Sequence, residues 1–488
     1  MKIIDPYSHH AVKQPDRPAI VTDDKIIYYH EWEKIVRQTA AAFSNEPAVH
    51  NRVAIFLPNG HLFLQVFAGA SAAGWANVVG DMKWSKSEVE ARLNEVEPDI
   101  IVADESMKDV FQNQDAKIIF SGEISEWVHT HNDWQPDEKA NAPFYIGFTS
   151  GSTGQPKAFV RSHQSWVESF KCNQIDLGMT AEDHVLIPGS FVNSIFIYGA
   201  LSTLYIGGTV YVLNKFSTSR LMNVLKNNPI SVIYVVPTMI HALINDGWKG
   251  VQQLTFISTG AKLLPSVKNE MKGHFPHASI YEFYGASELS FITVLKDDNQ
   301  MTYADSVGQA FHNVEIKICG DDGKEVPPGE TGVLYVRSKM LFDGYINNQG
   351  ETDNVLDGDW ATVHDIAKKD ENDFIYILGR KNDMILYGGI NIYPQEIEEV
   401  LNRVDSVEEV VVFGAKDAYW GEKVAAYIKG DVTIRELKKH CRDHLSSYKI
   451  PRIWRKVDRF PYTSGGKISR TEVKNWLEEG KHEKSRDR

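Results

Sequence analysis

Cysteine is scarce in this sequence of 488 residues. Only Cys172, Cys319 and Cys441 occur, and neither a paired nor a histidine-interleaved spacing surrounds them. We therefore expect three reduced thiols, and the spacing suggests neither a disulfide framework nor a zinc site. Hydrophobic residues make up 42% of the chain. A small disulfide scaffold and a disordered chain are thus excluded, and the length predicts more than one domain.

Positive charge is also in deficit, because the formal net charge is -13. No basic stripe is present to neutralise a nucleic-acid backbone, and this argues against a general nucleic-acid binder. Small anionic ligands remain compatible with an acidic protein, since a local nest of backbone amides can bind phosphate.

Long apolar segments are almost absent. No basic region followed by a long apolar core stands at the start, so no signal peptide is predicted and we expect a cytoplasmic protein. The exception is the uncharged run at residues 195–213, which is nearly as long as a membrane span. Gly207, Gly208 and Thr209 divide this run into a helical and a β-branched piece. It therefore predicts a buried helix followed by a buried strand, and no transmembrane segment.

Short apolar, β-branched runs alternate with helix-like segments along most of the chain. Examples are VIYVV from Val232, LTFIS from Leu254 and the helix-like VKNEMKGHF from Val267. This alternation is typical of an α/β fold. After about Leu378 the pattern changes to an acidic helix started by proline, a strand-like run and a basic tail segment. A smaller C-terminal α+β domain is predicted, behind a glycine-bearing joint near residues 379–383.

The strongest local signal is a loop rich in glycine and hydroxyl groups that directly follows the apolar run FYIGF. Its residues are Thr149, Ser150, Gly151, Ser152, Thr153, Gly154, Gln155, Pro156 and Lys157. Backbone N–H groups and hydroxyls can face one anion here, and the lysine adds a mobile positive charge. A P-loop NTPase is rejected, because Pro156 stands where that motif needs its second glycine and Ala158 follows the lysine. A flexible surface loop is the other alternative.

TSGSTGQPK resembles the signature loop of the superfamily of acyl-CoA synthetases, nonribosomal-peptide adenylation domains and luciferases. Further motifs, in the family's order, extend the resemblance from about Asp16 to Arg470. The resemblance implies an α/β fold whose large N-terminal multi-sheet domain, residues 1–379, binds ATP and the acyl group. A hinge at residues 380–383 and a small mobile C-terminal α+β domain at residues 384–488, which carries the catalytic lysine, complete the expected organisation.

Two segments match the family's adenine and metal motifs. The first is STGA from Ser258, in which the small residues Gly260 and Ala261 let the adenine base approach the backbone. The second is YGASE from Tyr284, which is similar to the family's Tyr-Gly-x-Thr-Glu. The resemblance implies that Tyr284 stacks on adenine, Ser287 contacts the α-phosphate and Glu288 binds Mg²⁺. A carboxylate suits a hard cation that bridges phosphate oxygens.

The expected ribose contacts come from two later segments. WATVHD from Trp360 resembles the motif whose aspartate, here Asp365, binds the ribose hydroxyls. His364 replaces the glycine that the family usually has before this aspartate. Downstream, Arg380 matches the second ribose or phosphate contact.

The expected moving parts lie beyond Arg380. By resemblance, Asn382 occupies the hinge position, and asparagine tolerates unusual φ values. TSGGKISR from Thr463 is similar to the loop that carries the adenylation lysine, here Lys467. That ammonium must reach the acyl carboxylate and the α-phosphate as negative charge builds there. Gly388 and Gly389 match the glycine strand that lines the coenzyme A channel.

The acyl pocket is the least specified part of the site. By position, it is lined by Phe191, Val192, Asn193, Ser194 and Tyr198, and Asn193 stands where many relatives carry histidine. The apolar neighbours predict a fatty or aryl acid. The chain length of that acid cannot be predicted from these residues.

The resemblance implies an AMP-forming ligase. It adenylates a carboxylic acid with ATP, releases pyrophosphate and transfers the acyl group to the thiol of coenzyme A, with Mg²⁺ as cofactor. Two alternatives remain: a free-standing adenylation enzyme that loads a carrier protein, although no carrier domain is visible, and a non-catalytic nucleotide-binding relative. Glu288 and Lys467 argue against the last alternative, since a protein that only binds nucleotide needs neither.

Overall fold

The computed structural model describes the chain except residues 113–114, 130–133, 135–141, 151–155, 301, 388–389, 418–420, 463–466 and 479–488. The chain divides into two compact units. We call Met1–Glu315 with Val336–Ala361 the N-terminal unit, and Ile316–Tyr335 with Thr362–Arg488 the C-terminal unit. Each unit is described by itself.

A nine-stranded sheet forms one half of the N-terminal unit. Its six central strands, from β13 to β1, run parallel, and antiparallel strands flank them at both edges. In spatial order the strands are β15 (Gln309–Ala310), β14 (Ser290–Leu295), β13 (Ala278–Ala286), β12 (Leu254–Ser258), β11 (Val232–Val235), β9 (His184–Ile187), β10 (Thr209–Val212), β1 (Pro18–Val21) and β2 (Ile26–Tyr28). Helices cover parallel strands on both faces, which explains the continuous apolar runs in the sequence.

A seven-stranded sheet forms the other half of this unit. In spatial order it contains β18 (Gly344–Tyr345), β8 (Pro156–Ser162), β7 (Pro143–Ser150), β4 (Ala76–Val79), β3 (Arg52–Phe56), β5 (Ile100–Ala103) and β6 (Lys117–Phe120). The strands from β7 to β6 are parallel, whereas β8 returns antiparallel to β7 and also pairs with β18. The sheet thereby brings a segment near residue 345 beside the expected phosphate loop.

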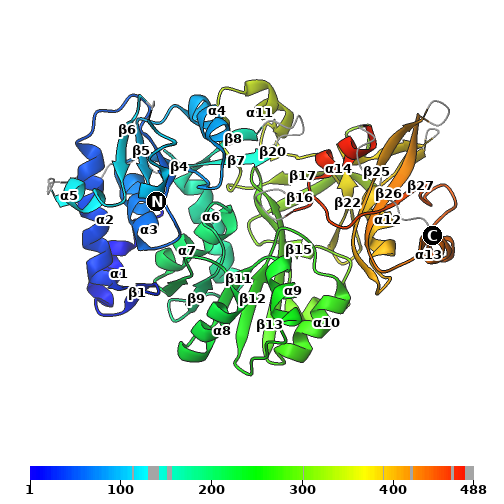
Figure 1. The fold of residues 1–488 in the computed structure, drawn as a ribbon, viewed down its shortest axis with the longest axis horizontal. Coiled ribbons are helices and arrows are strands. Elements are labelled where there is room, and N and C mark those ends of the chain that lie inside the picture. The colour runs from blue at the N-terminus through cyan, green and yellow to red at the C-terminus, as the bar shows by residue number, and fades with distance from the viewer. Residues whose placement is uncertain are drawn as a thin grey trace. The chain divides into compact units, whose positions relative to one another are not determined.

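Eleven α-helices belong to the described part of the N-terminal unit. They are α1 (Tyr7–Lys13), α2 (Tyr29–Ser44), α3 (His61–Ala72), α4 (Lys86–Val96), α5 (Ile124–His129), α6 (His163–Ile175), α7 (Ser194–Ile206), α8 (Thr218–Asn227), α9 (Pro237–Asn245), α10 (Pro265–His274) and α11 (Gln349–Val355). Single 3₁₀ turns occur at η1 (Glu105–Met107) and η2 (Asp297–Asn299). Helix α2 packs against α3, and α6 against α7 (Figure 1).

The apolar run at residues 195–213 folds as its sequence predicts. Helix α7 ends at Gly207, whose φ of 103° lies in the left-handed region that favours glycine. The chain then enters β10, which is buried along its whole length. Among the described residues, no helix is both long enough and apolar enough to cross a membrane.

The C-terminal unit contains a five-stranded sheet with helices packed against it. Its strands are β24 (Ile390–Ile392), β23 (Ile385–Tyr387), β26 (Gly421–Gly430), β25 (Val407–Asp417) and β27 (Ile453–Lys456), and its α-helices are α12 (Pro394–Leu401), α13 (Ile434–His444) and α14 (Arg470–Glu478). Apolar clusters cover both faces of the sheet: Val412 packs toward α12 and α13, and Val411 packs toward α14. The prediction of a mixed α/β fold with a smaller C-terminal α+β domain is confirmed.

A third sheet contains strands at the three places where the chain passes between the units, after Glu315, Tyr335 and Ala361. It includes β16 (Glu315–Cys319), β17 (Thr331–Arg337), β19 (Leu356–Asp357), β20 (Trp360–Ala361), β21 (Asp365–Lys369) and β22 (Ile375–Arg380). Residues 316–335 and 362–379 thus group with the C-terminal unit, although the expected domain boundary assigns them to residues 1–379. A compact unit and a rigid moving body need not coincide, so the hinge at residues 380–383 stays a prediction.

Candidate active site

The expected phosphate loop connects two antiparallel strands of the seven-stranded sheet. Strands β7 and β8 pair with Thr149 opposite Lys157. Residues 151–155, and with them Gly151, Ser152, Thr153 and Gly154, lie outside the described residues, as does the side chain of Ser150. The structure therefore places the two ends of the loop, and Lys157 stands at its exit.

Lys157 belongs to a polar network that closes across strand β18. Its ammonium donates to Glu351 Oε2 at 2.5 Å and lies 5.7 Å from the centre of the Tyr345 ring. The Tyr345 hydroxyl in turn donates to Glu288 Oε1 at 2.6 Å. Burial, followed by the negative charge of Glu288, raises the pKa of Tyr345, so this phenol stays a neutral donor. The network joins the expected phosphate lysine to the expected magnesium carboxylate.

Arg161 fixes the backbone of the same region through hydrogen bonds. This side chain is buried, and its guanidinium donates to the backbone carbonyls of Ser287, at 3.0 Å, and Met340, at 2.7 Å. Burial lowers the pKa of Arg161 to about 10, and the negative charges of Asp343 and Glu288 oppose the shift. At neutral pH this arginine keeps its positive charge and fixes the backbone at Ser287.

The segment from Tyr284 to Glu288 forms a tight return between β13 and β14. Gly285 is required here, because a Cβ at this position would clash with the carbonyl oxygen of Ser290. Glu288 is 8% exposed, and its backbone carbonyl accepts a hydrogen bond from Phe342 N–H at 2.9 Å. The turn thus presents a buried carboxylate from a constrained backbone, which suits a cation ligand.

The expected adenine segment follows the neighbouring strand β12. Strands β12 and β13 run parallel, with Ser258 opposite Glu282. Gly260 has a φ of +96°, and Thr259 Oγ1 donates to the carbonyl of Phe283 at 2.9 Å. Because both parallel strands end at the same edge, Gly260 and Ala261 lie beside the strand that carries Tyr284. This arrangement brings the expected adenine residues together.

The five expected acyl-pocket residues differ in burial. Phe191 and Tyr198 are core residues: the Phe191 N–H donates to Asn59 Oδ1 at 2.9 Å, and the Tyr198 hydroxyl donates to Ser169 O at 2.9 Å. Val192, Asn193 and Ser194 are partly exposed where α7 begins. These three, rather than the two aromatics, can contact a ligand without repacking the core.

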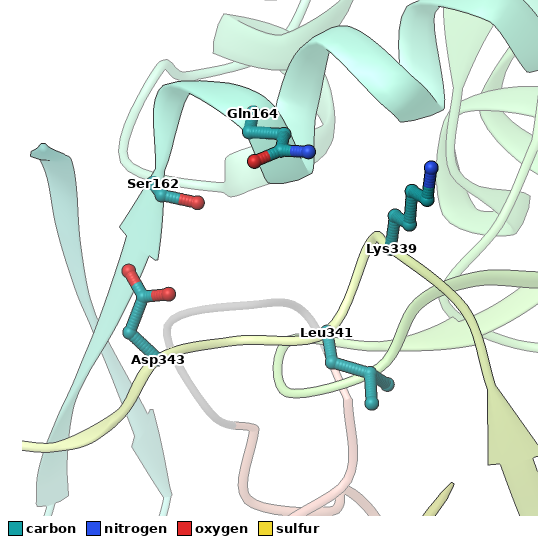
Figure 2. Close-up of a pocket in the computed structure, with 5 residues that line it drawn as sticks. All are labelled: Ser162, Gln164, Lys339, Leu341 and Asp343. Atoms are coloured by element: carbon teal, nitrogen blue, oxygen red, sulfur yellow. The ribbon is translucent and has the colours of Figure 1, made fainter. Parts of the chain in front are cut away.

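A separate polar cavity of about 320 Å³ lies beside β8 (Figure 2). Its lining residues are Ser162, Gln164, Lys339, Leu341 and Asp343. Figure 2 shows Ser162 and Asp343 at one side and Lys339 at another. Burial raises the pKa of Asp343, and the charge of Arg161 opposes this shift. The sequence analysis assigned no role to these residues.

In the C-terminal unit, Asp365 and Arg380 face each other across two paired strands. Asp365 opens β21, Arg380 ends β22, and Arg380 Nε donates to Asp365 Oδ1 at 3.3 Å. His364 has a φ of 60°, the left-handed conformation that glycine adopts without cost. The histidine therefore accepts a strained backbone of the kind that the family's glycine would relieve.

Lys467 lies in the same unit as this pair. Desolvation is the main cause of its lowered pKa, the positive charge of Arg380 acts in the same direction, and Asp365 opposes both. Residues 463–466 before it lie outside the described residues, and Tyr462 and Ile468 form an isolated β-bridge. Three expected functional groups thus interact electrostatically within the C-terminal unit.

The remaining expected residues are described only in part. Gly388 and Gly389 lie outside the described residues. The backbone of Asn382 forms part of the 3₁₀ turn η3 (Lys381–Asp383), but its side chain is not described. Next to it, the Asp383 carboxylate forms an ion pair with Lys474 Nζ at 3.3 Å.

Sequence reasoning missed Arg161, Tyr345 and Glu351. Tyr345 and Glu351 lie far along the chain from Lys157, and Glu351 is 194 positions away. Only the pairing of β18 with β8 brings them near the loop. No local motif marks them, although a Gly-Tyr pair after an apolar run is a weak signal for a strand edge.

A hairpin loop with a lysine, a turn of small residues and a buried carboxylate suit an enzyme that binds a nucleoside triphosphate and a divalent cation. The model of the AMP-binding enzyme family matches residues 7–346, and that of the AMP-binding enzyme C-terminal domain matches residues 396–467. The chain belongs to the AMP-binding enzyme family.

Several known proteins are similar over nearly the whole chain. An uncharacterized acyl–CoA ligase, YhfT of Bacillus subtilis, is 43% identical over 98% of this chain and 99% of its own. A putative long chain fatty acid-CoA ligase, VraA of Staphylococcus epidermidis, is 30% identical over 97% and 98%. ATP-bound MatB from Rhodopseudomonas palustris has a TM-score of 0.88 at 22% identity, covering 99% of this chain and 100% of that one. The o-succinylbenzoate CoA synthetase MenE of Bacillus subtilis, in complex with AMP, has a TM-score of 0.87 at 24% identity, covering 96% and 97%.

Family membership and these ligase relatives define the class of reaction. The protein is an AMP-forming acid–thiol ligase: it converts a carboxylic acid and ATP to acyl-AMP and then forms the coenzyme A thioester. ATP and coenzyme A are its substrates, and Mg²⁺ is its cofactor. The identity of the acid is not defined by this membership.

Proposed function

We propose that the protein activates a fatty or aryl carboxylic acid, with nucleotide chemistry organised by the network of Lys157, Tyr345 and Glu288. That network carries the proposal, because Lys157 at the end of the phosphate loop lies 5.7 Å from the centre of the Tyr345 ring, and the Tyr345 hydroxyl donates to the buried Glu288 carboxylate. The partly exposed start of α7 at Val192 and Asn193 supports an apolar acyl group. The names of relatives, a long chain fatty acid-CoA ligase and a 2-succinylbenzoate–CoA ligase, fall in the same two acid classes.

In the first half-reaction the N-terminal unit binds and orients ATP. The phosphate loop and Lys157 contact the phosphates, Gly260, Ala261 and Tyr284 hold adenine, and Ser287 contacts the α-phosphate. Glu288 would hold Mg²⁺, which supplies positive charge as pyrophosphate leaves. The ion pair of Lys157 with Glu351 keeps the ammonium beside the loop until a phosphate replaces that carboxylate.

The C-terminal unit supplies the remaining groups. Asp365 accepts hydrogen bonds from the ribose hydroxyls, Arg380 provides a second contact, and Lys467 neutralises charge on the acyl carboxylate and the α-phosphate. A rotation about Asn382 then withdraws Lys467 and brings Gly388 and Gly389 to the pantetheine path. Lys467 is exposed, and desolvation, with the positive charge of Arg380, lowers its pKa. An ammonium that already lies near the expected ribose contacts and is open to a ligand supports a role in charge stabilisation.

The test is to follow two products with a panel of acids. Pyrophosphate release should require ATP, Mg²⁺ and a fatty or aryl acid, and a CoA thioester should form at a comparable rate. If the acyl group instead reaches only a phosphopantetheinylated carrier protein, the carrier-loading alternative replaces coenzyme A as acceptor. If no acid in the panel supports pyrophosphate release, the assignment of the acid class is wrong.

The requirement for ATP and coenzyme A also supports our proposal that the enzyme acts in the cytoplasm.

Asn193 gives a sharper test of the acyl pocket. Asn193→His should change the relative kcat/KM of short, long and aromatic acids by about 10-fold, since single pocket contacts discriminate substrates by 1–3 kcal/mol. The dependence on ATP should stay the same. Ser219→Ala, an exposed change on α8, serves as the control. An unchanged ranking of the acids would show that Asn193 does not contact the acyl group.

A further inference from the structure

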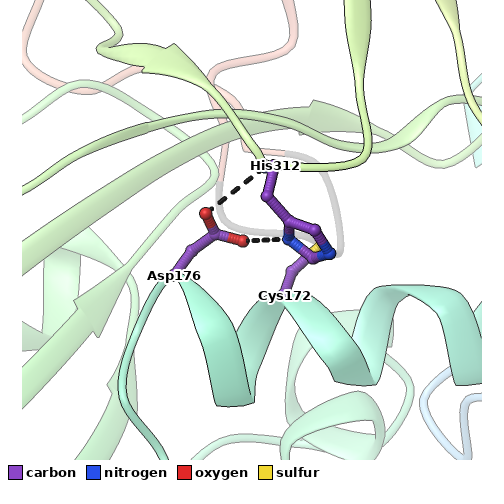
Figure 3. A group of neighbouring side chains, drawn as sticks. All are labelled: Cys172, Asp176 and His312. Atoms are coloured by element: carbon purple, nitrogen blue, oxygen red, sulfur yellow. Dashed lines mark hydrogen bonds and ion pairs between the residues drawn. The ribbon is translucent and has the colours of Figure 1, made fainter.

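Three potential metal ligands from separate parts of the chain converge in the N-terminal unit. Cys172 and Asp176 are one helical turn apart at the end of α6, and His312 belongs to the loop after β15. One donor atom from each residue lies within 4.8 Å of the other two. Figure 3 shows the Asp176 carboxylate directed at the His312 ring, with Cys172 beside that ring.

The histidine and the carboxylate are already oriented toward each other. His312 Nδ1 and Asp176 Oδ2 are 2.7 Å apart, and the His312 backbone N–H also donates to Asp176 at 3.3 Å. The side chains of His312 and Asp176 are 30% and 12% exposed, respectively. Solvent therefore reaches this side of the cluster, so an ion has a path of entry.

The thiol closes the buried side of the cluster. Cys172 is fully buried, and its Sγ lies 3.2 Å from Asn313 Oδ1 and 3.8 Å from Met340 Sδ. Asn313 is fixed in turn, because its amide donates to the carbonyl of Glu168 at 3.1 Å. The thiol thus faces polar and sulfur atoms that can accept from it or coordinate a cation beside it.

We propose that Cys172, Asp176 and His312 form a zinc site. Thiolate, imidazole and carboxylate are the three protein ligand types that zinc prefers. As the zinc–sulfur bond forms, Cys172 gives up its thiol proton. His312 binds as a neutral imidazole and keeps its proton on the other ring nitrogen. The thiolate and the carboxylate balance the two positive charges of zinc, and a water molecule or Asn313 Oδ1 completes four-coordination.

The present spacing is close to what such a site needs. Ligand bonds of 2.0–2.3 Å at tetrahedral angles place donor atoms about 3.2–3.8 Å apart. The cluster reaches that range if Cys172 moves toward the ion by about 1 Å and if His312 Nδ1 and Asp176 Oδ2, now 2.7 Å apart, separate by about 0.5 Å. The sequence gives no warning of this site, because His312 lies 136 positions beyond Asp176 and only the fold brings them together.

The position of the site gives zinc a structural consequence. His312 comes three residues before Glu315, where the chain passes out of the N-terminal unit. Met340 beside Cys172 also accepts the hydrogen bond from Arg161 that braces the region of Ser287. Bound zinc would therefore link α6 to the loop that carries His312, close to the Met340 backbone that Arg161 holds. Loss of the metal should lower the thermal stability of the N-terminal unit.

The test uses the reduced, metal-free, full-length protein titrated with Co²⁺ and with Zn²⁺. Co²⁺ should give a sulfur-to-cobalt charge-transfer band at one equivalent, Zn²⁺ should displace it, and Mg²⁺ should not. Cys172→Ser should abolish the band and weaken zinc binding by at least about 100-fold, while His312→Gln and Asp176→Asn should weaken it by about 10–100-fold. Cys441→Ser is the matched control, since Cys441 is also a buried thiol on a helix.

Two results would overturn the proposal. One is the absence of a cobalt–sulfur band in the wild-type protein. The other is zinc binding that survives Cys172→Ser and His312→Gln but falls in His444→Ala, which would assign the metal to the His440 and His444 pair on α13. His312→Gln changes a partly exposed loop residue and keeps the test valid if Cys172→Ser fails to fold. Circular dichroism of each metal-free variant establishes which variants are folded.

Discussion

In the N-terminal unit, Lys157 pairs with Glu351 and lies beside the Tyr345 ring, and the Tyr345 hydroxyl donates to Glu288. In the C-terminal unit, the charges of Arg380 and Asp365 act on Lys467. The first arrangement can hold ATP in one orientation before any acid arrives. In the second, Lys467 lies outside the named strands and helices, which suits a group that must approach and leave.

Lys467→Ala should produce the largest effect, and it tests directly whether the lysine of the C-terminal unit acts in one half-reaction only. Pyrophosphate release should fall by about 100–1000-fold, because one stabilising charge is lost as negative charge builds on the reacting groups. Thioester formation from synthetic acyl-AMP should stay near the wild-type rate. Lys439→Ala, on the exposed face of α13, is the control. Equal losses in both half-reactions would show that the lysine does not act in one step only.

Asn382→Pro should damage the two half-reactions unequally, by about 10-fold relative to each other. Proline fixes φ near -65° and removes an N–H, so it should trap one orientation at η3. Adenylation is the expected survivor, since turnover starts from the state with Lys467 in place. The measurement compares pyrophosphate release with thioester formation from acyl-AMP, after circular dichroism shows a folded protein. A variant that retains both activities would move the hinge elsewhere.

Tyr345→Phe should have a smaller effect than Lys467→Ala, and one confined to the N-terminal network. The change removes the hydroxyl that donates to Glu288 and keeps the ring beside Lys157. A hydrogen bond to a charged group contributes about 1.5–3 kcal/mol, so kcat/KM should fall by about 10–100-fold, with a higher Mg²⁺ requirement. Tyr281→Phe, on the neighbouring β13, controls for loss of a phenol. An unchanged Mg²⁺ dependence would leave Tyr345 with a packing role alone.

The sequence was sufficient for features that depend on local chain chemistry. The Gly207-Gly208-Thr209 break predicted where α7 ends and β10 begins, because glycine at a helix end supplies the left-handed conformation. The resemblance assigned Thr149 and Lys157 to one loop and Asp365 and Arg380 to the nucleotide, and the structure pairs each set across two antiparallel strands close in the sequence.

Features that depend on distant pairing were not predictable in this way. Glu351 reaches Lys157 only because β18 joins the edge of β8, and His312 reaches Asp176 only because its loop returns to α6. Arg161 lies in strand β8 and carries a charge of the kind that is usually exposed, yet it is buried and donates to two backbone carbonyls. Burial of a charged side chain is a property of the packed structure, and no local pattern encodes it.

Acid should destabilise the N-terminal unit more than the C-terminal unit, because His163 is buried at the start of α6. Its ring stacks on Phe144 at 4.7 Å, and desolvation, with the nearby charge of Lys2, lowers the pKa of His163 to about 3. The unfolded chain, with a histidine pKa near 6.5, binds this proton more readily than the folded unit does. The stability that neutral His163 provides is therefore present above about pH 6.5 and is lost as the pH falls toward 3.

Hydrogen exchange read by mass spectrometry can report α6 and α13 separately between about pH 7 and pH 4.5. The free energy of opening at α6 should fall by about 1–3 kcal/mol across this range, since each pH unit in the window is worth up to 1.4 kcal/mol for one proton. His163→Phe should remove most of that fall, because phenylalanine keeps the stack on Phe144 and takes up no proton. His61→Phe is the matched control: burial also lowers the pKa of His61, but this residue starts α3 and is only half-buried. If α6 in His163→Phe loses as much stability in acid as in the wild type, His163 is not the group that makes the N-terminal unit acid-sensitive.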